Sequence, residues 1–281
     1  MNKSEVIFEL HALKSKLGII PSKRYSNILN YYAKKNFGSW NTALRTAGLS
    51  VRTQQKAKLP QESAELYYFL GLLYTDGHVV WTEKKRDYQI QIYTSNEAEL
   101  RMIIELFEKL FDYIPYVRKR LMGFNKKINY SIHLCSKNVI EHISKEYGLF
   151  IGAKAKRIRL PKFKLKDNFW DFLRGVVDGD GSICKNGVRV FSASRLFLNE
   201  LAQILKSYEF RPSVKHGRKD IELYYVLSTY GQKDMFRLYD LLYSSSKFFY
   251  PRKKNTFNDM LKSFKNRNRE ALQSRLSSRL S

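Results

Sequence analysis

Hydrophobic and polar positions follow two different periods along the central part of the chain. A period of two, typical of β-strands with one buried face, runs through residues 87–93 (DYQIQIY), 128–135 (INYSIHLC), 187–192 (GVRVFS) and 222–228 (ELYYVLS). Apolar positions recur at helical spacing in residues 96–111, 138–147, 196–208 and 232–243. This mixture of strands and helices predicts an α+β fold.

The same order of elements occurs twice. Residues 68–78 (YFLGLLYTDGH) and 171–182 (DFLRGVVDGDGS) are apolar helical runs that reach an Asp-Gly pair, and the two pairs lie 104 residues apart. Strands and helices follow each pair in similar order. Each copy is therefore predicted to be α-β-β-α-β-β-α, with the weaker strands placed from the spacing alone. A repeat of this length indicates a duplicated domain and not a solenoid.

A separate helical segment precedes the repeat. Residues 5–16 and 27–35 each predict a short helix. The stretch 37–49 (FGSWNTALRTAGL) predicts a third, with Ser39 as the N-cap residue and Trp40 as the anchor of a small core. Asn41 and Arg45 are four residues apart and share the polar face of this third helix. Three short helices with a basic outer face can dock one helix in a DNA groove.

Composition then narrows the class of partner. The chain has 51 Lys+Arg against 26 Asp+Glu, a net charge of +25, while 43% hydrophobic residues suffice for a packed core. Such a charge favours a polyanion, most often nucleic acid, with an anionic membrane surface as the alternative. The longest apolar stretch, residues 67–74, is far shorter than the roughly 20 residues that span a bilayer. We therefore expect no membrane association.

The charge is uneven, and the cysteines are few. Residues 1–60 carry +9 and residues 258–281 carry +4, so the ends of the chain are the most one-sided parts. The basic tail 258–281 is predicted to be either a helix on DNA or a disordered arm. Cys135 and Cys184 form no disulfide framework, which fits a reducing compartment. We expect a protein that is not secreted, in the cytoplasm or nucleoid of a bacterium or phage-infected cell, or in an organelle.

The two apolar helices carry small residues at helical spacing. Gly175 and Gly179 lie four apart on one face of the second helix, and Gly71 and Thr75 hold the same positions in the first. Small residues at this spacing let two helix backbones approach closely. A packed helix pair without chemistry would explain these residues.

Packing alone does not explain why both helices end in an aspartate. Asp76 and Asp180 follow the apolar runs directly, where the negative end of the helix dipole disfavours an acid. Two such carboxylates brought together by the helix pair would also repel each other. A divalent cation that neutralises the pair accounts for both.

The two motifs, FLGLLYTDG (69–77) and LRGVVDGDG (173–181), resemble the signature of the LAGLIDADG homing endonuclease family over all nine positions. The FGSWN stretch resembles the small repeat found beside homing endonuclease domains. Two motifs in one chain are similar to the single-chain members. The resemblance implies two pseudo-symmetric αββαββα halves that form a DNA-binding saddle. The implied parts are a helical module at 1–55, halves at 60–165 and 166–257, and the tail 258–281.

The resemblance also implies an active site. Asp76 and Asp180 take the position of the metal-binding catalytic carboxylates, and the backbone carbonyls of Thr75 and Gly179 share that role. Mg²⁺ or another divalent cation is the implied cofactor. Lys154 and Lys253, which follow the last helix of each copy, are candidates to stabilise charge on the phosphate. An ordinary solvated or phosphate-contacting lysine is the alternative for each. The first motif departs from the family pattern at Tyr74, where the second has Asp178, but this position is not a metal ligand.

The strands supply candidates for contact with DNA. On the face opposite the apolar positions, Gln89, Gln91, Tyr93, Ser131 and His133 are predicted to meet base edges in the major groove. A solvated outer face is the alternative. Basic residues near strand ends and turns more often hold phosphates. They are Lys84, Lys85, Arg86, Arg118, Lys119, Arg120, Arg189, Lys215, Arg218 and Lys219.

The function predicted from these features is site-specific double-strand cleavage of DNA at a long asymmetric target by a monomer. A zinc nuclease is excluded, because the five histidines are scattered. Two alternatives of the same fold stay open: an RNA-binding intron maturase, with intron RNA as partner, and a non-cleaving DNA-binding regulator. The aspartate pair favours the nuclease, since a pure binder has no need of both carboxylates.

Overall fold

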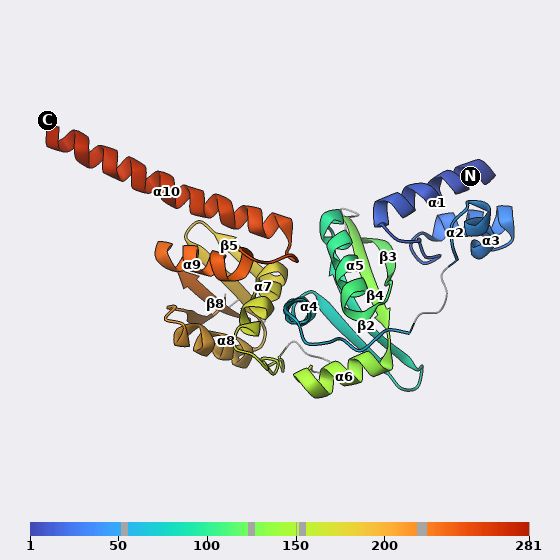
Figure 1. Ribbon diagram of the computed structural model, residues 1–281, viewed down its shortest axis with the longest axis horizontal. Helices are drawn as coiled ribbons and strands as arrows, with labels where there is room; N and C mark the ends of the chain where they lie inside the picture. The colour runs from blue at the N-terminus through green and yellow to red at the C-terminus, as the bar shows by residue number, and fades with distance from the viewer. Residues whose placement is uncertain (52–55, 123–126, 150, 152–155, 218–223, 281) are drawn as a thin grey trace. The chain divides into compact units, whose positions relative to one another are not determined.

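The computed structural model describes residues 1–51, 56–122, 127–149, 151, 156–217 and 224–280 (Figure 1). The chain divides into two compact units. The first comprises Met1–Glu62 and Asp76–Ile143, and the second Ser63–Thr75 and Ser144–Ser281. Lys154, Arg218 and Lys219 lie outside the described residues. Within the described part, no helix combines the length and apolar character that crossing a membrane requires.

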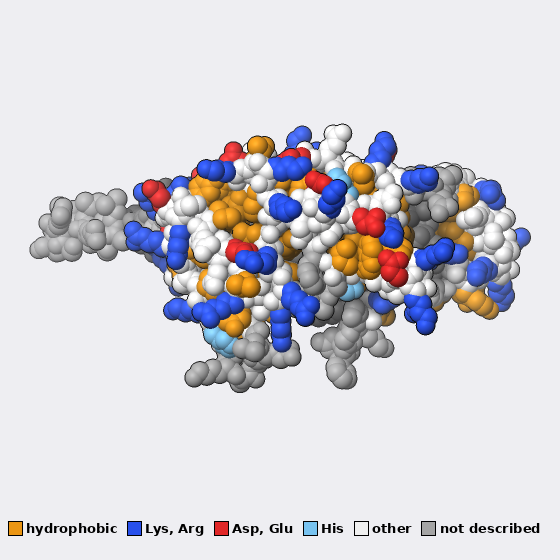
Figure 2. Space-filling view, turned by 90° about the horizontal axis from the view of Figure 1, so that it is seen from below, with side chains coloured by type: hydrophobic (Ala, Val, Ile, Leu, Met, Phe, Trp, Pro, Cys, Tyr) orange, Lys and Arg blue, Asp and Glu red, His pale blue; other side chains and the backbone are white. Residues whose placement is uncertain are grey.

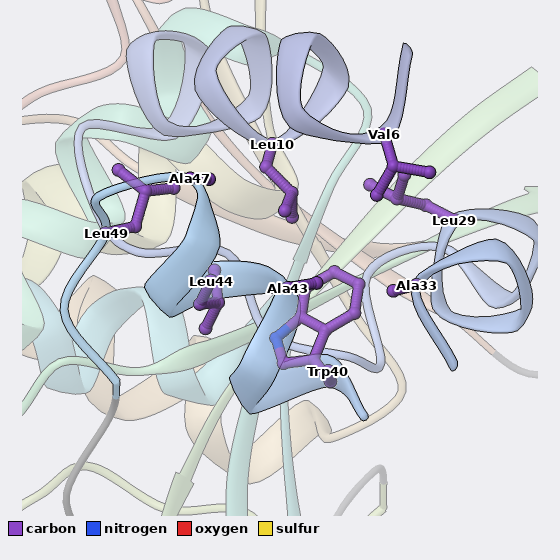
Figure 3. Packing of buried hydrophobic residues seen from close by; sticks show 9 residues of the cluster. All are labelled: Val6, Leu10, Leu29, Ala33, Trp40, Ala43, Leu44, Ala47 and Leu49. Carbon is purple, nitrogen blue, oxygen red and sulfur yellow. The ribbon is translucent and has the colours of Figure 1, made fainter. Parts of the chain in front are cut away.

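The first unit begins with a three-helix module formed by α1 (Lys3–Leu17), α2 (Asn27–Phe37) and α3 (Trp40–Thr46). Side chains cap each helix: Asn2 and Glu5 form a capping box at α1, and Ser26 and Ser39 accept backbone N–H groups at α2 and α3. The core gathers around the buried indole of Trp40, as Figure 3 shows. Its members are Val6, Leu10, Leu29, Ala33, Trp40, Ala43, Leu44, Ala47 and Leu49. The prediction that Trp40 anchors a small core is confirmed.

The rest of the first unit is an antiparallel sheet with helices. Its strands are β1 (Gly77–Thr82), β2 (Asp87–Thr94), β3 (Tyr116–Met122) and β4 (Lys127–Cys135), in the order β1-β2-β4-β3. Helix α5 (Glu97–Phe111) packs on one face, where Ile90, Ile92, Ile132 and Leu134 are fully buried. Helix α6 (Lys137–Tyr147) leads into the second unit. The predicted alternation in both central strands is confirmed on this face.

The second unit repeats the pattern and adds helices. Its sheet has β5 (Gly181–Cys184), β6 (Gly187–Ser192), β7 (Ser213–His216) and β8 (Tyr225–Tyr230), in the order β5-β6-β8-β7. Its helices are α4 (Ala64–Tyr74), α7 (Asn168–Asp180), α8 (Arg195–Ser207), α9 (Gln232–Tyr243) and α10 (Pro251–Leu280). The equal strand order in both sheets and the order α-β-β-α-β-β-α in both copies confirm the predicted duplication and the α+β class.

Two expectations differ from the structure at their boundaries. The strand predicted at 222–228 begins at Tyr225, and residues 218–223 are outside the described part. The segment expected to be a separate tail at 258–281 continues α10, which begins at Pro251 and runs through Leu280. Proline at the first helical position is favourable, because its fixed φ suits the helix and its missing N–H has no partner there.

Candidate active site and nucleic-acid interface

The motif helices α4 and α7 touch through their backbones within the second unit. A Cβ atom added to Gly71 would lie 2.3 Å from the carbonyl oxygen of Phe172 and 2.8 Å from the Cα of Gly175. A Cβ on Gly175 would lie 2.3 Å from the carbonyl oxygen of Tyr68. Any side chain larger than hydrogen therefore forces the helices apart. The close approach predicted from the spacing of small residues is confirmed at this pair.

The first motif ends in a capped turn. Helix α4 ends at Tyr74, and the Thr75 hydroxyl donates to the carbonyls of Gly71 and Leu72 at 3.0 and 3.1 Å. Asp76 follows and is half-buried. Its backbone carbonyl accepts the Tyr93 N–H at 3.2 Å, which fixes Asp76 against β2 within the first unit. The carboxylate thus lies at the junction of a helix end and a sheet.

The second motif has the same construction. Asp180 is the last residue of α7 and is exposed, while Gly179 before it is half-buried. The Gly181 N–H donates to the Val177 carbonyl and opens β5 directly. Both aspartates are therefore placed where a motif helix gives way to the first strand of a sheet. Asp76 belongs to the first unit and Asp180 to the second.

The expected ligand atoms are all oxygens. Each motif offers an aspartate carboxylate and the backbone carbonyl before it, at Thr75 and Gly179, which are hard donors of the kind that Mg²⁺ and Ca²⁺ prefer. The described residues contain no group of three or more His, Cys, Asp and Glu side chains that would hold a metal ion by itself.

Lys253 is the candidate lysine that the structure places beside a motif. It lies in the first turn of α10, is 9% exposed, and its ammonium donates to the backbone carbonyl of Gly181, the residue after Asp180. A buried ammonium needs such a partner, because burial of an unpaired charge is costly. Lys254, the next residue, instead donates to the Tyr243 carbonyl at 3.2 Å. Lys154 cannot be placed, since it falls outside the described residues.

The buried carboxylate of Asp178 holds the second motif helix in place. From the sequence, this position was only a difference between the two motifs. Asp178 is fully buried and accepts hydrogen bonds from the Tyr68 hydroxyl at 2.9 Å, the Tyr243 hydroxyl at 2.6 Å and the Tyr250 backbone N–H at 2.7 Å. Burial raises the pKa of this carboxyl to about 6, and the three hydrogen bonds oppose the rise. These contacts join α4, α7, α9 and the segment before α10.

Arg174, one helical turn before Asp178, completes this support. It is 3% exposed, and its guanidinium donates to the carbonyls of Phe248 at 3.0 Å and Leu242 at 3.1 Å. It also pairs with Asp171 at 2.8 Å. An arginine and an aspartate four residues apart inside an apolar helix were the sequence signal of this network, and the first motif has Leu70 and Tyr74 at those positions.

The outward face of the first sheet carries a continuous polar network. Gln89, Gln91 and Tyr93 are half-buried along β2, and each side chain bonds to the next. The Gln89 carbonyl also accepts the Tyr116 hydroxyl at 2.9 Å and lies 3.0 Å from Nδ1 of His133. These bonds fix the orientation of the Gln89 amide before any partner binds.

Ser131 and His133 lie on this face but do not reach its surface. They are 6% and 2% exposed, which corrects the expectation that both side chains meet base edges directly. His133 stacks on Tyr116 with ring centroids 4.4 Å apart, and its Nε2 lies 2.8 Å from the Ser131 hydroxyl. Burial, followed by the nearby charges of Arg118, Arg24 and Arg120, lowers the pKa of His133 to about 3. His133 is therefore neutral, and its Nδ1 helps to hold the Gln89 side chain in place.

The remaining predicted contact residues are accessible where the structure describes them. Asn41 and Arg45 are exposed on α3, and Lys84, Lys85 and Arg86 are exposed in the turn between β1 and β2. Arg118, Arg189 and Lys215 lie on outward sheet faces, as their pairing with Ser131, Ser228 and Val226 shows. Lys119 and Arg120 are exposed on β3. Lys and Arg side chains are spread over the surface drawn in Figure 2, with Asp and Glu side chains among them.

Comparisons with known proteins agree with this architecture. Residues 171–243 match the model of the LAGLIDADG-like domain, and residues 1–50 match that of the homing endonuclease associated repeat. A search of curated proteins gives no match.

Solved structures share the fold at low sequence identity. A mesophilic variant of the homing endonuclease I-DmoI is 16% identical, with a TM-score of 0.53 over 68% of this chain and 95% of that one. I-DmoI in complex with DNA and Ca gives 16% identity and a TM-score of 0.52 over the same shares. The homing endonuclease I-WcaI bound to its DNA recognition sequence is 13% identical, with a TM-score of 0.52 over 76% of this chain and 96% of that one.

Proposed function

We propose that this chain, which carries a homing endonuclease associated repeat and a LAGLIDADG-like domain, is a monomeric, site-specific endonuclease that makes double-strand breaks in DNA with Mg²⁺ or another divalent cation. The observation that carries the proposal is the construction of the two motifs. In each motif an aspartate stands directly before the first strand of a sheet, at or just after the end of a helix of the Gly71–Gly175 pair. Two solved structures of this fold contain DNA, and one of them also contains Ca, which supports DNA as the partner and a divalent cation as the cofactor.

The residues divide the chemistry between them. The Asp76 carboxylate with the Thr75 carbonyl, and the Asp180 carboxylate with the Gly179 carbonyl, would supply the ligands for a divalent cation. When bound, the cation lowers the pKa of an attacking water and stabilises charge on the phosphate oxygens. Lys253 supplies a positive charge beside Asp180, where it can stabilise the negative charge that develops at phosphorus. Asp178 and Arg174 would contact neither the cation nor the phosphate, and they keep the end of α7 in place.

Recognition of the target belongs to the outward faces of the sheets. Gln89 and Gln91 present amides of fixed orientation, and glutamine pairs with adenine in the major groove. Arg189, Lys215 and the exposed turn Lys84–Arg86 would contact phosphates, which position the protein without reading sequence. Asn41 and Arg45 of the helical module would add contacts beyond the sheets.

The test is cleavage of duplex DNA that spans the insertion site of the protein's own gene, with the intervening sequence removed. Asp76→Asn and Asp180→Asn are expected to abolish cleavage while DNA binding persists, because each removes a carboxylate charge at constant size. Asp240→Asn, an exposed aspartate of α9, is the matched control and should cleave as the unaltered protein does. Cleavage that persists in both motif variants, or tight binding of intron RNA without any DNA cleavage, would overturn the proposal.

A further inference from the structure

A basic cleft lies within the first unit, between the helical module and strand β3. Its volume is about 1010 Å³, and α1, α2, the segment between them and β3 line it. One acidic residue, Glu9, and six basic residues line it. The basic residues are Lys23, Arg24, Lys34, Arg118, Lys119 and Arg120.

The two walls of the cleft are held together by direct contacts. The Ser22 hydroxyl donates to the Val117 carbonyl of β3 at 3.4 Å, and Tyr25 stacks on Tyr130 with ring centroids 6.4 Å apart. The Arg101 guanidinium of α5 donates to the carbonyl of Lys16, at the end of α1, at 3.1 Å. The segment between α1 and α2 thus covers β3, an edge strand that would otherwise expose unpaired backbone groups. These contacts fix the position of the module against the sheet and so define the shape of the cleft.

The basic side chains of the cleft lie close enough to repel one another. Arg24 and Arg118 both lie over the ring of Tyr116, at 4.8 and 5.4 Å from its centroid. In the part of the chain that the structure describes, no ion pair joins any of the six cations to a carboxylate. Such a concentration of one charge is stabilised when a polyanion binds.

The shape and lining of the cleft favour a sugar-phosphate backbone. Ile28 and Leu121 are 69% and 62% exposed and line it beside the cations, and Asn27 and Asn30 add amides. Apolar surface flanked by cations and amides suits sugars and phosphates in alternation, whereas a small anion would leave Ile28 and Leu121 exposed. Most protein–DNA hydrogen bonds go to phosphate and sugar, and they fix the register of the protein on the duplex.

We propose that this cleft binds the sugar-phosphate backbone of double-stranded DNA, outside the part of the target that the first sheet covers. The module and the first sheet then act as one continuous binding surface, and the protected DNA extends further on one side of the cleavage position than on the other. The choice of duplex DNA rests on the proposed function, while the cleft itself rests on the charges and contacts above.

The test compares two triple variants with the same change in charge. Lys23→Ser, Lys34→Ser and Lys119→Ser remove three cations from the cleft. Lys145→Ser, Lys206→Ser and Lys233→Ser remove three exposed lysines from α6, α8 and α9, which line neither the cleft nor an outward sheet face. Binding of the full-length proteins to a duplex of arbitrary sequence is measured over a range of salt concentrations. Each lost phosphate contact reduces the slope of log K against log salt by about 0.9, so the cleft variant should lose about 2 to 3 units.

The control variant is expected to keep the slope of the unaltered protein. An equal loss in both variants, or no loss in the cleft variant, would overturn the assignment. A loss seen with single-stranded RNA but not with duplex DNA would overturn the choice of partner. Hydroxyl-radical footprints on the DNA target that the protein cleaves should show longer protection on one side of the cleavage position. This extra protection should become shorter in the cleft variant only. Failure of the unaltered protein to cleave would refute the nuclease and leave the salt measurement intact, so the two proposals fail separately.

Discussion

Among single residues, the Asp178 carboxylate on α7 binds groups from three other segments of the second unit. Burial raises its pKa from 3.8 to about 6. The folded protein therefore binds this proton more tightly than the unfolded chain does, and the stability that Asp178 contributes is present below about pH 4 and is lost as the pH rises to about 6. A shift of this size corresponds to about 3 kcal/mol in the free energy of unfolding.

Asparagine does not titrate, so the free energy of unfolding of Asp178→Asn should not fall as the pH rises. Relative to the unaltered protein, this variant should therefore become more stable by about 3 kcal/mol as the pH rises from 4 to 7. The asparagine oxygen can accept from the Tyr68 hydroxyl and the Tyr250 N–H, and its amide can donate to the Tyr243 hydroxyl, which reverses that one bond. Urea unfolding at both pH values measures the gain. Asp178→Leu, which leaves three buried donors without an acceptor, should cost about 3 kcal/mol at pH 4, and this cost should shrink toward pH 7 because leucine does not titrate. Equal pH dependence in the asparagine variant and the unaltered protein would contradict this account.

His133 makes stability depend on pH in the opposite sense. Its folded-state pKa is lowered to about 3 from an ordinary 6.5, so its contribution is present above about pH 6.5 and is lost as the pH falls toward 3. His133→Phe keeps a ring to stack on Tyr116 and removes the titration. We expect the melting temperature of this variant to fall less steeply than that of the unaltered protein between pH 6.5 and pH 4. An unchanged slope would assign the acid sensitivity to other groups.

At the scale of elements, the close contact between α4 and α7 requires glycine at two positions, Gly71 and Gly175. Gly71→Ala and Gly175→Ala each place a methyl group 2.3 Å from a backbone carbonyl oxygen of the facing helix, so the helices have to separate. We expect each variant to lose about 1–3 kcal/mol of stability, as overpacked cores do. Because Asp76 and Asp180 directly follow these helices, cleavage should fall more than DNA binding does. Denaturant unfolding and cleavage assays of the same samples measure both.

Gly148→Ala provides the contrast for these two variants. Gly148 has φ +75° and nothing within 4 Å of an added Cβ, so alanine there costs only the strain of a left-handed backbone, about 1 kcal/mol. Its cleavage should match that of the unaltered protein. If Gly148→Ala impaired cleavage as much as Gly71→Ala did, the loss would reflect general destabilisation and not the separation of the helices.

The strands that sequence alternation identified are the central ones. Residues 87–93 and 187–192 alternate clearly because one face of β2 and β6 is buried under helices. The four strands placed only from spacing, β1, β3, β5 and β7, are the edges of their sheets. Edge strands are short or highly charged, as Arg118–Arg120 in β3 illustrates, and so lack the alternating pattern.

The candidate site was predictable where its chemistry is local in sequence. Each Asp-Gly pair directly follows the small residues of its motif along the chain, so both could be identified from spacing. The burial of Ser131 and His133 and the cleft beside β3 could not, because residues distant in sequence create both. Arg24 lies over Tyr116, which stacks on His133, and Ser22 bonds to β3. The three partners of Asp178 likewise come from segments far apart along the chain.

For the whole molecule, the net charge of +25 is a cost in the absence of DNA. Self-repulsion of like charges destabilises the compact state, and salt screens it over about 10 Å at 0.1 M. The salt bridges of the described residues act in the opposite sense, but most are exposed, and pairs of that kind contribute little. Repulsion should therefore dominate the response of stability to salt.

The melting temperature of the protein alone should rise as NaCl is increased from low to physiological concentration, because screening relieves this repulsion. Duplex DNA at low salt should raise it further by binding the folded state, and this increment should shrink as salt weakens binding. Scanning calorimetry with and without a duplex of arbitrary sequence measures both effects. A melting temperature that fell with added salt would show that ion pairs outweigh the repulsion. A DNA increment insensitive to salt would show that phosphate contacts do not dominate binding.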